Sequence, residues 1–252
     1  MRPCVRDAFV PFTISFEGGY ITWMFPDVEG KVSTGFGLLL EPVALAIGLP
    51  WRRVDGTLAS RTEIVADWMN VKNYPNAARL GYKSVEHVAR LRLDREGLYQ
   101  AFQGKLMHND AYLQHRFPGF AEWPADAQLG CHSMAWACGP AAWDASNPVG
   151  FPKMGRALMA LDFAAAAAEC HMNEWDAGVF NPGLVPRNKA NLVLFKNAAT
   201  VMAGGLDQDV LHWPTELSEE PTDPGFAIVY SLPPPLESPE LDEPDDEPPK
   251  AA

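Results

Sequence analysis

Long apolar runs are missing from this sequence of 252 residues. No stretch approaches the roughly 20 consecutive apolar residues that a helix needs to cross a bilayer, so we expect no membrane insertion. The segment before residue 17 contains two arginines but no sustained apolar region, so we do not expect a signal peptide. We therefore expect synthesis in the cytoplasm, with a separate route outward if the target lies beyond the membrane.

Cysteines and metal-ligand patterns are also scarce. The chain has four cysteines, which are too few and too scattered for a disulfide framework. Cys131 and Cys138 would lie about 10 Å apart on one helix, which is too far for a disulfide. Neither a Cys-x-x-Cys nor a His-Glu-x-x-His spacing occurs, and Gly35-x-Gly37 is not part of a phosphate-binding loop motif. We expect reduced buried cysteines, no metal site and no cofactor.

A basic excess is absent, although nucleic-acid-binding proteins need one. The formal net charge is −12, but residues 215–252 contain eleven acidic residues and one lysine, a net charge of −10. The first 214 residues therefore carry only −2. This distribution argues against a nucleic-acid partner and assigns the acidity to the C-terminal segment.

The C-terminal segment also differs from the rest of the chain in composition. Residues 215–252 contain nine prolines and few aromatic residues, a composition that is typical of disorder. The exception is Phe226–Leu232, a strand-like patch that could instead dock on the globular part. We predict a domain at 1–213 and a disordered, acidic, Pro-rich tail at 214–252, with docking of the patch as the alternative.

Apolar spacing predicts a helix that ends at Glu17, followed by a short β-element and then mostly helices. Apolar residues recur at helical intervals over residues 5–16, Gly18-Gly19 predicts the stop, and Pro11 should kink the helix or confine its regular part to the residues after it. Residues 20–37 are rich in β-branched and aromatic residues with turn signals, which predicts a hairpin or meander. Further helices are predicted for residues 94–115, with Asp94 as N-cap, and for 125–138, 162–172 and 187–202. The predicted fold class is α+β, with a small β-lobe and a mainly helical lobe.

Three oxygen-bearing side chains, Glu17, Asp27 and Ser33, fall within seventeen residues. Glu17 ends the predicted helix, and the other two lie on the β-element that folds back beside it. An inverting glycosidase needs such a set, because one carboxylic acid protonates the leaving oxygen while a more distant carboxylate activates water. The carboxyl groups must then stand roughly 6.5–9.5 Å apart, and a neighbouring hydroxyl can hold the water in line. The spacing alone is a weak indication, because two acids and a serine often occur close together.

The residues around this set resemble the catalytic stretch of phage-type lysozymes, glycoside hydrolase family 24. That family has a Glu-Gly at a helix end, then an Asp, a Thr six positions later and a Gly-x-Gly, and it closes with a Gly-Leu-x-x-Arg-Arg-x-Ala-Glu-x-x-Leu-Phe helix. The similar segments in this chain are residues 16–20, 27–37, 127–138, 151–170 and 182–195. The resemblance covers residues 5–200, loosely from 40 to 120. It implies a lysozyme-like fold with a cleft between the two lobes.

The resemblance also implies a role for each matching residue. Glu17 is the general acid, Asp27 is the second carboxylate, and Ser33 stands at the position of the water-binding Thr. Thr34, next to Ser33, is a substitute candidate for that hydroxyl. Arg187 matches the first arginine of the closing motif, which in such relatives pairs with the catalytic Glu.

Some positions stay open or depart from the family. Trp23 is the candidate for a sugar-stacking wall of the cleft, with ordinary packing as the alternative. The interval between the two carboxylates is one residue longer than usual, which leaves Glu29 as a rival for the second carboxylate. Leu38 stands where many relatives have His, and the second Arg and the Glu of the closing motif are Asn188 and Asn191.

The implied activity is that of a muramidase, which hydrolyses the β-1,4 bond between N-acetylmuramic acid and N-acetylglucosamine in the glycan strands of bacterial peptidoglycan. Two alternatives stay open: a lytic transglycosylase, which would not need Asp27 or Ser33, and a catalytically decayed wall-binding or virion component. Without a signal peptide, the protein would reach the wall as a phage endolysin, as a virion-associated lysozyme or through a dedicated secretion machine. The acidic tail predicts weak wall association and is a candidate contact for an immunity or delivery partner.

Overall fold

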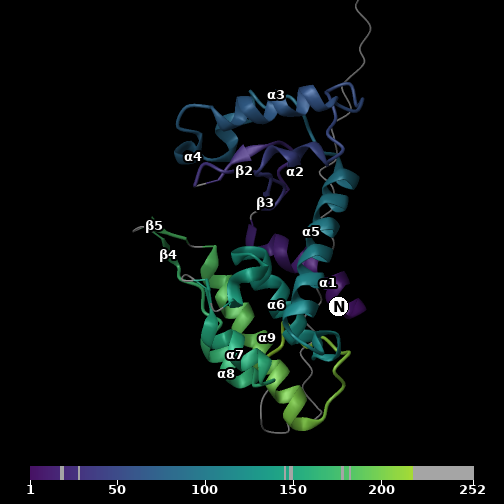
Figure 1. The fold of residues 1–252 in the computed structure, drawn as a ribbon, viewed down its shortest axis with the longest axis vertical. Coiled ribbons are helices and arrows are strands. Elements are labelled where there is room, and N and C mark those ends of the chain that lie inside the picture. The colour runs from purple at the N-terminus through teal and green to yellow at the C-terminus, as the bar shows by residue number, and fades with distance from the viewer. Residues whose placement is uncertain are drawn as a thin grey trace, which may run out of the picture. The chain divides into compact units, whose positions relative to one another are not determined.

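The structure is a computed structural model that describes residues 1–17, 20–27, 29–144, 146–147, 150–176, 179–181 and 183–217 (Figure 1). Residues Met1–Leu217 form one compact unit, and Ser218–Ala252 are assigned to a second. The predicted disorder of the tail from residue 218 onward and the predicted Gly18-Gly19 stop lie outside the described residues.

Helix α1 (Pro3–Glu17) ends at the candidate acid, as predicted. Its apolar stripe is buried and includes Val5, Phe9 and Phe12. Pro11 lies within the helix at an exposed position, and helical residues precede it as well as follow it. Of the two predicted effects of Pro11, confinement of the helix to the residues after it is therefore wrong. Proline removes one backbone hydrogen bond, and burial of the stripe on the other side of the helix offsets that loss.

A three-stranded antiparallel sheet confirms the predicted meander. Its strands, in order, are β1 (Phe25–Pro26), β2 (Val32–Thr34) and β3 (Leu38–Leu39). Ser33 pairs with Phe25 on one side and with Leu39 on the other, so it lies in the central strand. The sheet is small because β1 and β2 each end in a turn and helix α2 begins shortly after β3.

Short helices accompany the sheet. They are α2 (Val43–Ile47), α3 (Arg61–Lys72), α4 (Ala77–Leu80) and the 3₁₀ turn η1 (Tyr82–Val85). Helix α3 contacts β1 and β2 and lies above the sheet in Figure 1. Its N-cap is Ser60, which forms a capping box with Glu63. These elements and the sheet together form the sheet-bearing part of the first unit.

Helix α5 (Arg95–Arg116) runs from the sheet-bearing part to the remaining helices (Figure 1). Asp94 caps it as predicted, because its Oδ1 accepts a hydrogen bond from the Gly97 N–H at 2.7 Å. The ring of Phe102 packs on that of Phe36, with 3.6 Å between the ring centres. Because Phe36 lies between β2 and β3, this contact fixes the turn of the sheet against α5.

The rest of the first unit is mainly helical and forms its helical part. It contains η2 (Phe120–Glu122), α6 (Ala125–Cys138), η3 (Pro140–Trp143), α7 (Pro152–Met159), α8 (Phe163–Glu169), β4 (Trp175–Asp176), β5 (Val179–Phe180) and α9 (Leu184–Gly204). Helix α6 contacts α1, α5 and α9. Twelve of its fourteen residues are buried, which confirms the prediction of a central buried helix.

The chain after α9 packs back on the first unit. The ring of Trp213 lies 4.9 Å from that of Phe12, and the buried carboxylate of Asp126 accepts hydrogen bonds from the backbone N–H groups of His212 and Trp213. The compact unit therefore extends to Leu217, beyond the boundary expected at residue 213.

Two apolar clusters fill the first unit. One joins α1, the sheet, α3 and α5, the other joins α6 to α9, and α6 contributes residues to both. The predicted α+β class is thus confirmed, with a mostly helical chain and a small antiparallel sheet. A search of the described residues finds no helix that is long and apolar enough to span a membrane.

Candidate active site

An arginine from near the C-terminal end of the unit holds the candidate acid Glu17. Nη2 of Arg187 on α9 donates a hydrogen bond to Oε1 of Glu17 at 2.6 Å. The side chain of Arg187 is 2% exposed, whereas that of Glu17 is 28% exposed. The carboxyl group therefore faces a buried cation on one side and solvent on the other. The structure brings together the two residues that the motif resemblance pairs.

Contacts with α1 and α6 fix the Arg187 side chain. Its Nη1 donates to the carbonyl oxygen of Ser133 at 3.4 Å, and the guanidinium lies 5.3 Å from the centre of the Phe16 ring. Burial lowers the pKa of Arg187 from its ordinary value, while the Glu17 carboxylate acts to raise it. Arginine stays charged in proteins, so Arg187 supplies a permanent positive charge to the carboxyl group.

The Gly-x-Gly turn between β2 and β3 lies against the same carboxyl group. Gly35 and Gly37 have φ angles of +62° and +82°, which favour glycine. A Cβ atom on Gly37 would lie 3.3 Å from Oε2 of Glu17. The intervening Phe36 is held by α6, because Nε1 of Trp136 donates to its carbonyl oxygen at 3.3 Å. The turn therefore places the sheet backbone directly beside the candidate acid.

Lys105 of α5 is a second cation near the site, and sequence analysis did not single it out. Its Nζ lies 4.0 Å from the centre of the Trp136 ring and donates to the Trp136 carbonyl oxygen at 3.5 Å. Burial lowers the pKa of Lys105 to about 8, with Glu17 acting to raise it and Arg187 to lower it. Lys105 is therefore electrostatically coupled to both members of the ion pair. In the sequence it is one of several polar residues in a long amphipathic helix, and no local pattern distinguishes it.

Asp27 lies in the turn after β1. Its Oδ1 accepts hydrogen bonds from the backbone N–H groups of Glu29 at 2.9 Å and Lys31 at 2.8 Å. Its backbone N–H donates to the Lys31 carbonyl oxygen at 2.8 Å. One carboxylate oxygen therefore caps the turn, and within the described ranges no residue donates to the other. That second oxygen, Oδ2, is the one available to a water molecule.

The hydroxyls of Ser33 and Thr34 have different surroundings. The Thr34 side chain is buried, and its Oγ1 lies 3.0 Å from the Trp23 carbonyl oxygen and 3.3 Å from that of Ile21. Thr34 thus holds the segment before β1 and is poorly suited to replace Ser33. Ser33 is buried as well, with 3% of its surface exposed, and no residue among those described forms a hydrogen bond with its hydroxyl.

The contacts of Trp23 and Glu29 are with residues other than the candidate acid. Nε1 of Trp23 donates to the Tyr82 carbonyl oxygen at 3.2 Å, and the guanidinium of Arg92 lies 5.2 Å from the centre of the Trp23 ring. Glu29 is exposed and forms an ion pair with Lys31. None of the contacts recorded between described residues joins either side chain to the candidate acid, so their roles in a cleft stay predictions.

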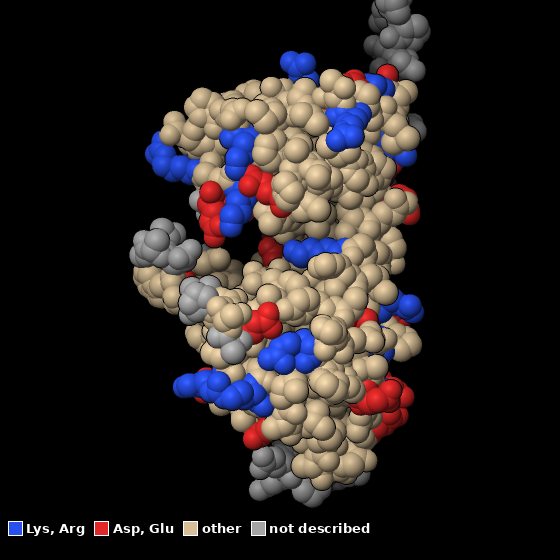
Figure 2. All heavy atoms as spheres, viewed as in Figure 1, with Lys and Arg blue, Asp and Glu red and all other residues tan. Residues whose placement is uncertain are grey.

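The surface is hollowed between the sheet-bearing part and the part that carries α6 and α9, and acidic and basic side chains gather along this hollow (Figure 2). Glu17, Gly37 and Arg187 belong to α1, the sheet turn and α9, and they meet where these two parts join. We therefore take this hollow as the candidate cleft.

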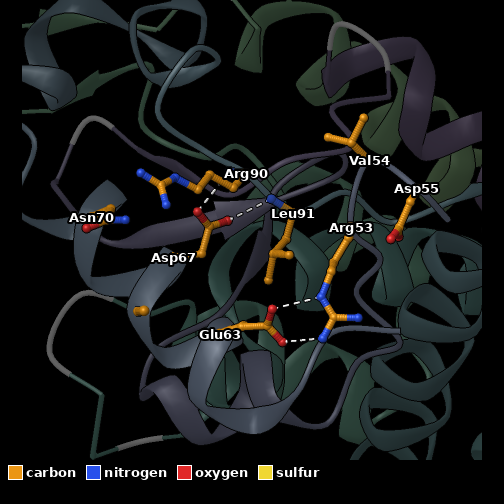
Figure 3. A pocket seen from close by; sticks show the side chains of 9 residues that line it. Arg53, Val54, Asp55, Glu63, Asp67, Asn70, Arg90 and Leu91 are labelled. Carbon is orange, nitrogen blue, oxygen red and sulfur yellow. Dashed lines mark hydrogen bonds and ion pairs between the residues drawn. The ribbon is translucent and has the colours of Figure 1, made fainter. Parts of the chain in front are cut away.

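A cavity of about 550 Å³ lies elsewhere, between α3 and the neighbouring loops (Figure 3). Both carboxylate oxygens of Glu63 accept hydrogen bonds from Arg53, at 2.7 and 2.6 Å. The buried carboxylate of Asp67 accepts the backbone N–H groups of Arg90 and Leu91. Because these polar groups already satisfy one another, the cavity offers few free groups to a ligand.

The residues at Glu17 can donate a proton and stabilise the carboxylate that remains. Within the described ranges, no group of three or more His, Cys, Asp or Glu side chains is placed to hold a metal ion. Comparisons with family models, curated proteins and solved structures return no match to this chain. The motif pattern and the geometry at Glu17 are therefore the basis for a functional interpretation.

Proposed function

We propose that the protein is a muramidase that hydrolyses the β-1,4 bond between N-acetylmuramic acid and N-acetylglucosamine in bacterial peptidoglycan. The observation that carries this proposal is the convergence of three distant segments on one carboxyl group. Glu17 ends α1, Gly37 approaches its Oε2, and Arg187 donates to its Oε1. The same positions carry the resemblance to phage-type lysozymes. The setting would be a cell wall reached by phage lysis, with a virion or through a dedicated secretion machine.

In this mechanism Glu17 supplies the proton that the leaving sugar needs. The protonated carboxyl group gives its proton to the glycosidic oxygen as the bond from that oxygen to C1 breaks. The carboxylate left on Glu17 is stabilised by the permanent charge of Arg187 and by the nearby charge of Lys105. Because the carboxyl group is partly exposed, a saccharide in the hollow can reach it.

A water molecule completes the reaction on the opposite face of the sugar. Its oxygen bonds to C1, and its proton passes to the free Oδ2 of Asp27, while the Ser33 hydroxyl holds it in line. The proton on Asp27 is then lost to solvent, and Glu17 is reprotonated from solvent. This route predicts inversion at C1, so the first product seen by NMR should be the α-anomer.

The second candidate function is that of a lytic transglycosylase. The hydrogen bonds of Asp27 are compatible with this activity. Oδ1 of this carboxylate accepts two backbone N–H groups of the turn. This structural role would account for the aspartate even if it took no part in catalysis. In a transglycosylase a hydroxyl of the sugar itself attacks C1, so neither Asp27 nor Ser33 would act on water. Glu17 would still protonate the leaving oxygen.

Mass spectrometry of digested peptidoglycan tests the proposal. Wild-type protein should release fragments with reducing ends, and Glu17→Gln should release none while keeping its circular dichroism spectrum. Fragments with 1,6-anhydro ends would show that the enzyme is a lytic transglycosylase and not a hydrolase. Equal digestion by the Glu17→Gln variant would overturn both enzymatic candidates, and no digestion by wild type would favour a decayed wall-binding protein.

A matched pair of variants separates the two candidates for the second carboxylate. Asp27→Asn keeps an oxygen that can accept the N–H groups of Glu29 and Lys31, so the turn should persist while the negative charge is lost. Glu29→Gln removes the rival charge from an exposed ion pair. We expect only Asp27→Asn to reduce hydrolysis, by about 100-fold or more. A loss confined to Glu29→Gln would assign the role to Glu29.

A further inference from the structure

Two large aromatic side chains lie exposed on the small hairpin before α9. Trp175 in β4 and Phe180 in β5 are cross-strand partners, and they are 57% and 43% exposed. Their ring centres are 5.1 Å apart, with an angle of 45° between the planes. The two rings therefore support each other, yet they leave a large part of their surface to solvent. The pair therefore forms a small exposed aromatic surface that a ligand can cover.

The base of this hairpin is tied down by hydrogen bonds. The Asn173 side chain accepts the Trp175 N–H at 3.1 Å and donates to the Trp175 carbonyl oxygen. The Asn181 N–H donates to the Glu174 carbonyl oxygen at 2.7 Å. The Asn188 side chain donates to Oε1 of Glu174 at 3.1 Å. The backbone that carries the Trp175 ring is thus held at its base, which lowers the entropy cost of binding there.

The hairpin is also connected to the candidate active site. Asn188, which anchors Glu174, directly follows Arg187 in α9. A Cβ atom on Gly183 would lie 3.5 Å from the carbonyl oxygen of Phe16, the residue before the candidate acid. Gly183 comes three positions after Phe180 in the chain, so their Cα atoms lie at most about 11 Å apart. In Figure 1 the hairpin projects toward the sheet-bearing part, on the side where Figure 2 shows the hollow.

Saccharide chemistry fits this position better than an extended apolar partner does. The exposed rings form a small platform, and exposed asparagines, Asn173 and Asn181, stand beside it. A pyranose ring presents apolar C–H groups on its faces and polar groups around its edge. It can therefore stack on an aromatic face while its edge meets amides or water.

We propose that Trp175 and Phe180 form a stacking platform for an N-acetylhexosamine unit of the glycan strand, away from the bond that is cut. This inference rests on the proposed function, because it identifies the platform's ligand with the strand that Glu17 would cleave. Trp175 and Phe180 are binding residues in this scheme and take no part in proton transfer. They position the strand so that its scissile bond reaches Glu17.

Binding of a β-1,4-linked N-acetylglucosamine tetramer tests the platform directly. Calorimetric titrations would use the Glu17→Gln background, in which the proposed cleavage is absent, and would be repeated with Trp175→Ala and Phe180→Ala. We expect Trp175→Ala to raise the dissociation constant about tenfold or more, and Trp175→Phe to recover much of the loss because it keeps an aromatic face. Tyr99→Ala is the matched control, because Tyr99 is 52% exposed on α5, and it should change binding less than about twofold. In the otherwise wild-type enzyme, Trp175→Ala should raise KM for solubilised wall with little change in kcat.

The outcomes distinguish failure of the platform from failure of the proposed function. If wild type hydrolyses wall but Trp175→Ala changes neither tetramer binding nor KM, the platform is wrong and the muramidase proposal stands. If tetramer binding needs Trp175 but Glu17→Gln digests wall normally, the platform stands and the muramidase mechanism falls. Equal losses in Tyr99→Ala and Trp175→Ala, or no tetramer binding at millimolar concentration, would overturn the platform.

Discussion

Glu17 and Arg187 are exposed to solvent to very different degrees, and removal of either partner should therefore have unequal effects on stability. Glu17→Ala leaves a guanidinium that is 2% exposed and that keeps only the Ser133 carbonyl oxygen at 3.4 Å and the Phe16 ring. Breaking a fully buried pair in this way costs about 3–5 kcal/mol. The Glu17 side is open to solvent, so water can replace part of the lost carboxylate. We expect a loss of about 2–3 kcal/mol in the free energy of unfolding.

Removal of Arg187 should cost less stability than removal of Glu17. Arg187→Met leaves a Glu17 carboxylate that is 28% exposed and can be hydrated, while methionine fills much of the vacated space. The expected loss is about 1 kcal/mol. The double variant replaces the whole pair by apolar groups and should also lose about 1 kcal/mol. The resulting interaction energy between the two sites is about −2 to −3 kcal/mol.

Urea unfolding followed by tryptophan fluorescence measures this cycle, with an unchanged dependence on urea as the sign of intact two-state behaviour. Glu17→Ala should also lower Tm by about 4–12 °C for a unit of this size. Glu29→Ala is the control, because it breaks an exposed pair with Lys31 and should change stability by less than about 0.5 kcal/mol. Additive single effects, within about 0.5 kcal/mol, would refute the pairing of Glu17 with Arg187.

Three further changes test other parts of the site. Gly37→Ala and Gly56→Ala both place alanine at a positive φ and should each cost about 1–2 kcal/mol. Only the first crowds Glu17, because a Cβ on Gly56 meets nothing within 4 Å. Wall digestion should therefore fall about tenfold or more in Gly37→Ala alone. Equal losses of digestion in Gly37→Ala and Gly56→Ala would contradict the contact between residue 37 and the Glu17 carboxyl group. Burial lowers the pKa of Lys105 to about 8, so its charge costs the folded state stability below pH 8, and the cost is relieved as pH rises toward the unfolded pKa of about 10.4. Lys105→Met should raise the free energy of unfolding by up to about 3 kcal/mol at pH 7, and by progressively less from pH 8 to 10. Urea titrations at each pH measure this difference. A variant that is less stable than wild type at pH 7 would refute this reasoning. Removal of residues 218–252 takes away ten acidic residues and one lysine, a net −9 out of −12. It should strengthen sedimentation with insoluble wall at low salt, and unchanged binding with unchanged salt dependence would exclude an electrostatic role for the tail.

Local sequence rules predicted helix boundaries well where helix-breaking or capping residues flank the helix. The bounds of α6 agree with the prediction because Pro124 and Gly139-Pro140 interrupt the apolar run on both sides. The start of α5 follows from the N-cap at Asp94. Weaker signals gave poorer bounds: α8 ends at Glu169 rather than at residue 172, and α9 begins at Leu184 rather than at residue 187. Helix propensity alone does not fix the ends of such segments, because tertiary contacts decide where the helix begins and ends.

The candidate site was less predictable, because its contacts join segments that are far apart in the sequence. The pairing of Glu17 with Arg187 spans 170 residues and was expected only through the family resemblance. Lys105 and Trp175 were missed, since a lysine in an amphipathic helix and a tryptophan before a turn carry no local sign of function. Their exposure and neighbours are set by how α5 and the β4–β5 hairpin pack, and only the folded chain contains that information.

The cost of the two cations at Glu17 is consistent with their proposed use. Burial of Arg187 and Lys105 opposes their charged forms, and one carboxylate cannot fully compensate both. A structure selected for stability alone would place apolar side chains there. When Glu17 gives up its proton, however, a negative charge appears beside groups that are already in place, and no reorganisation is needed at that moment. The same arrangement predicts that Lys105→Met stabilises the fold and also slows wall digestion, a combination that distinguishes a functional cation from a structural one.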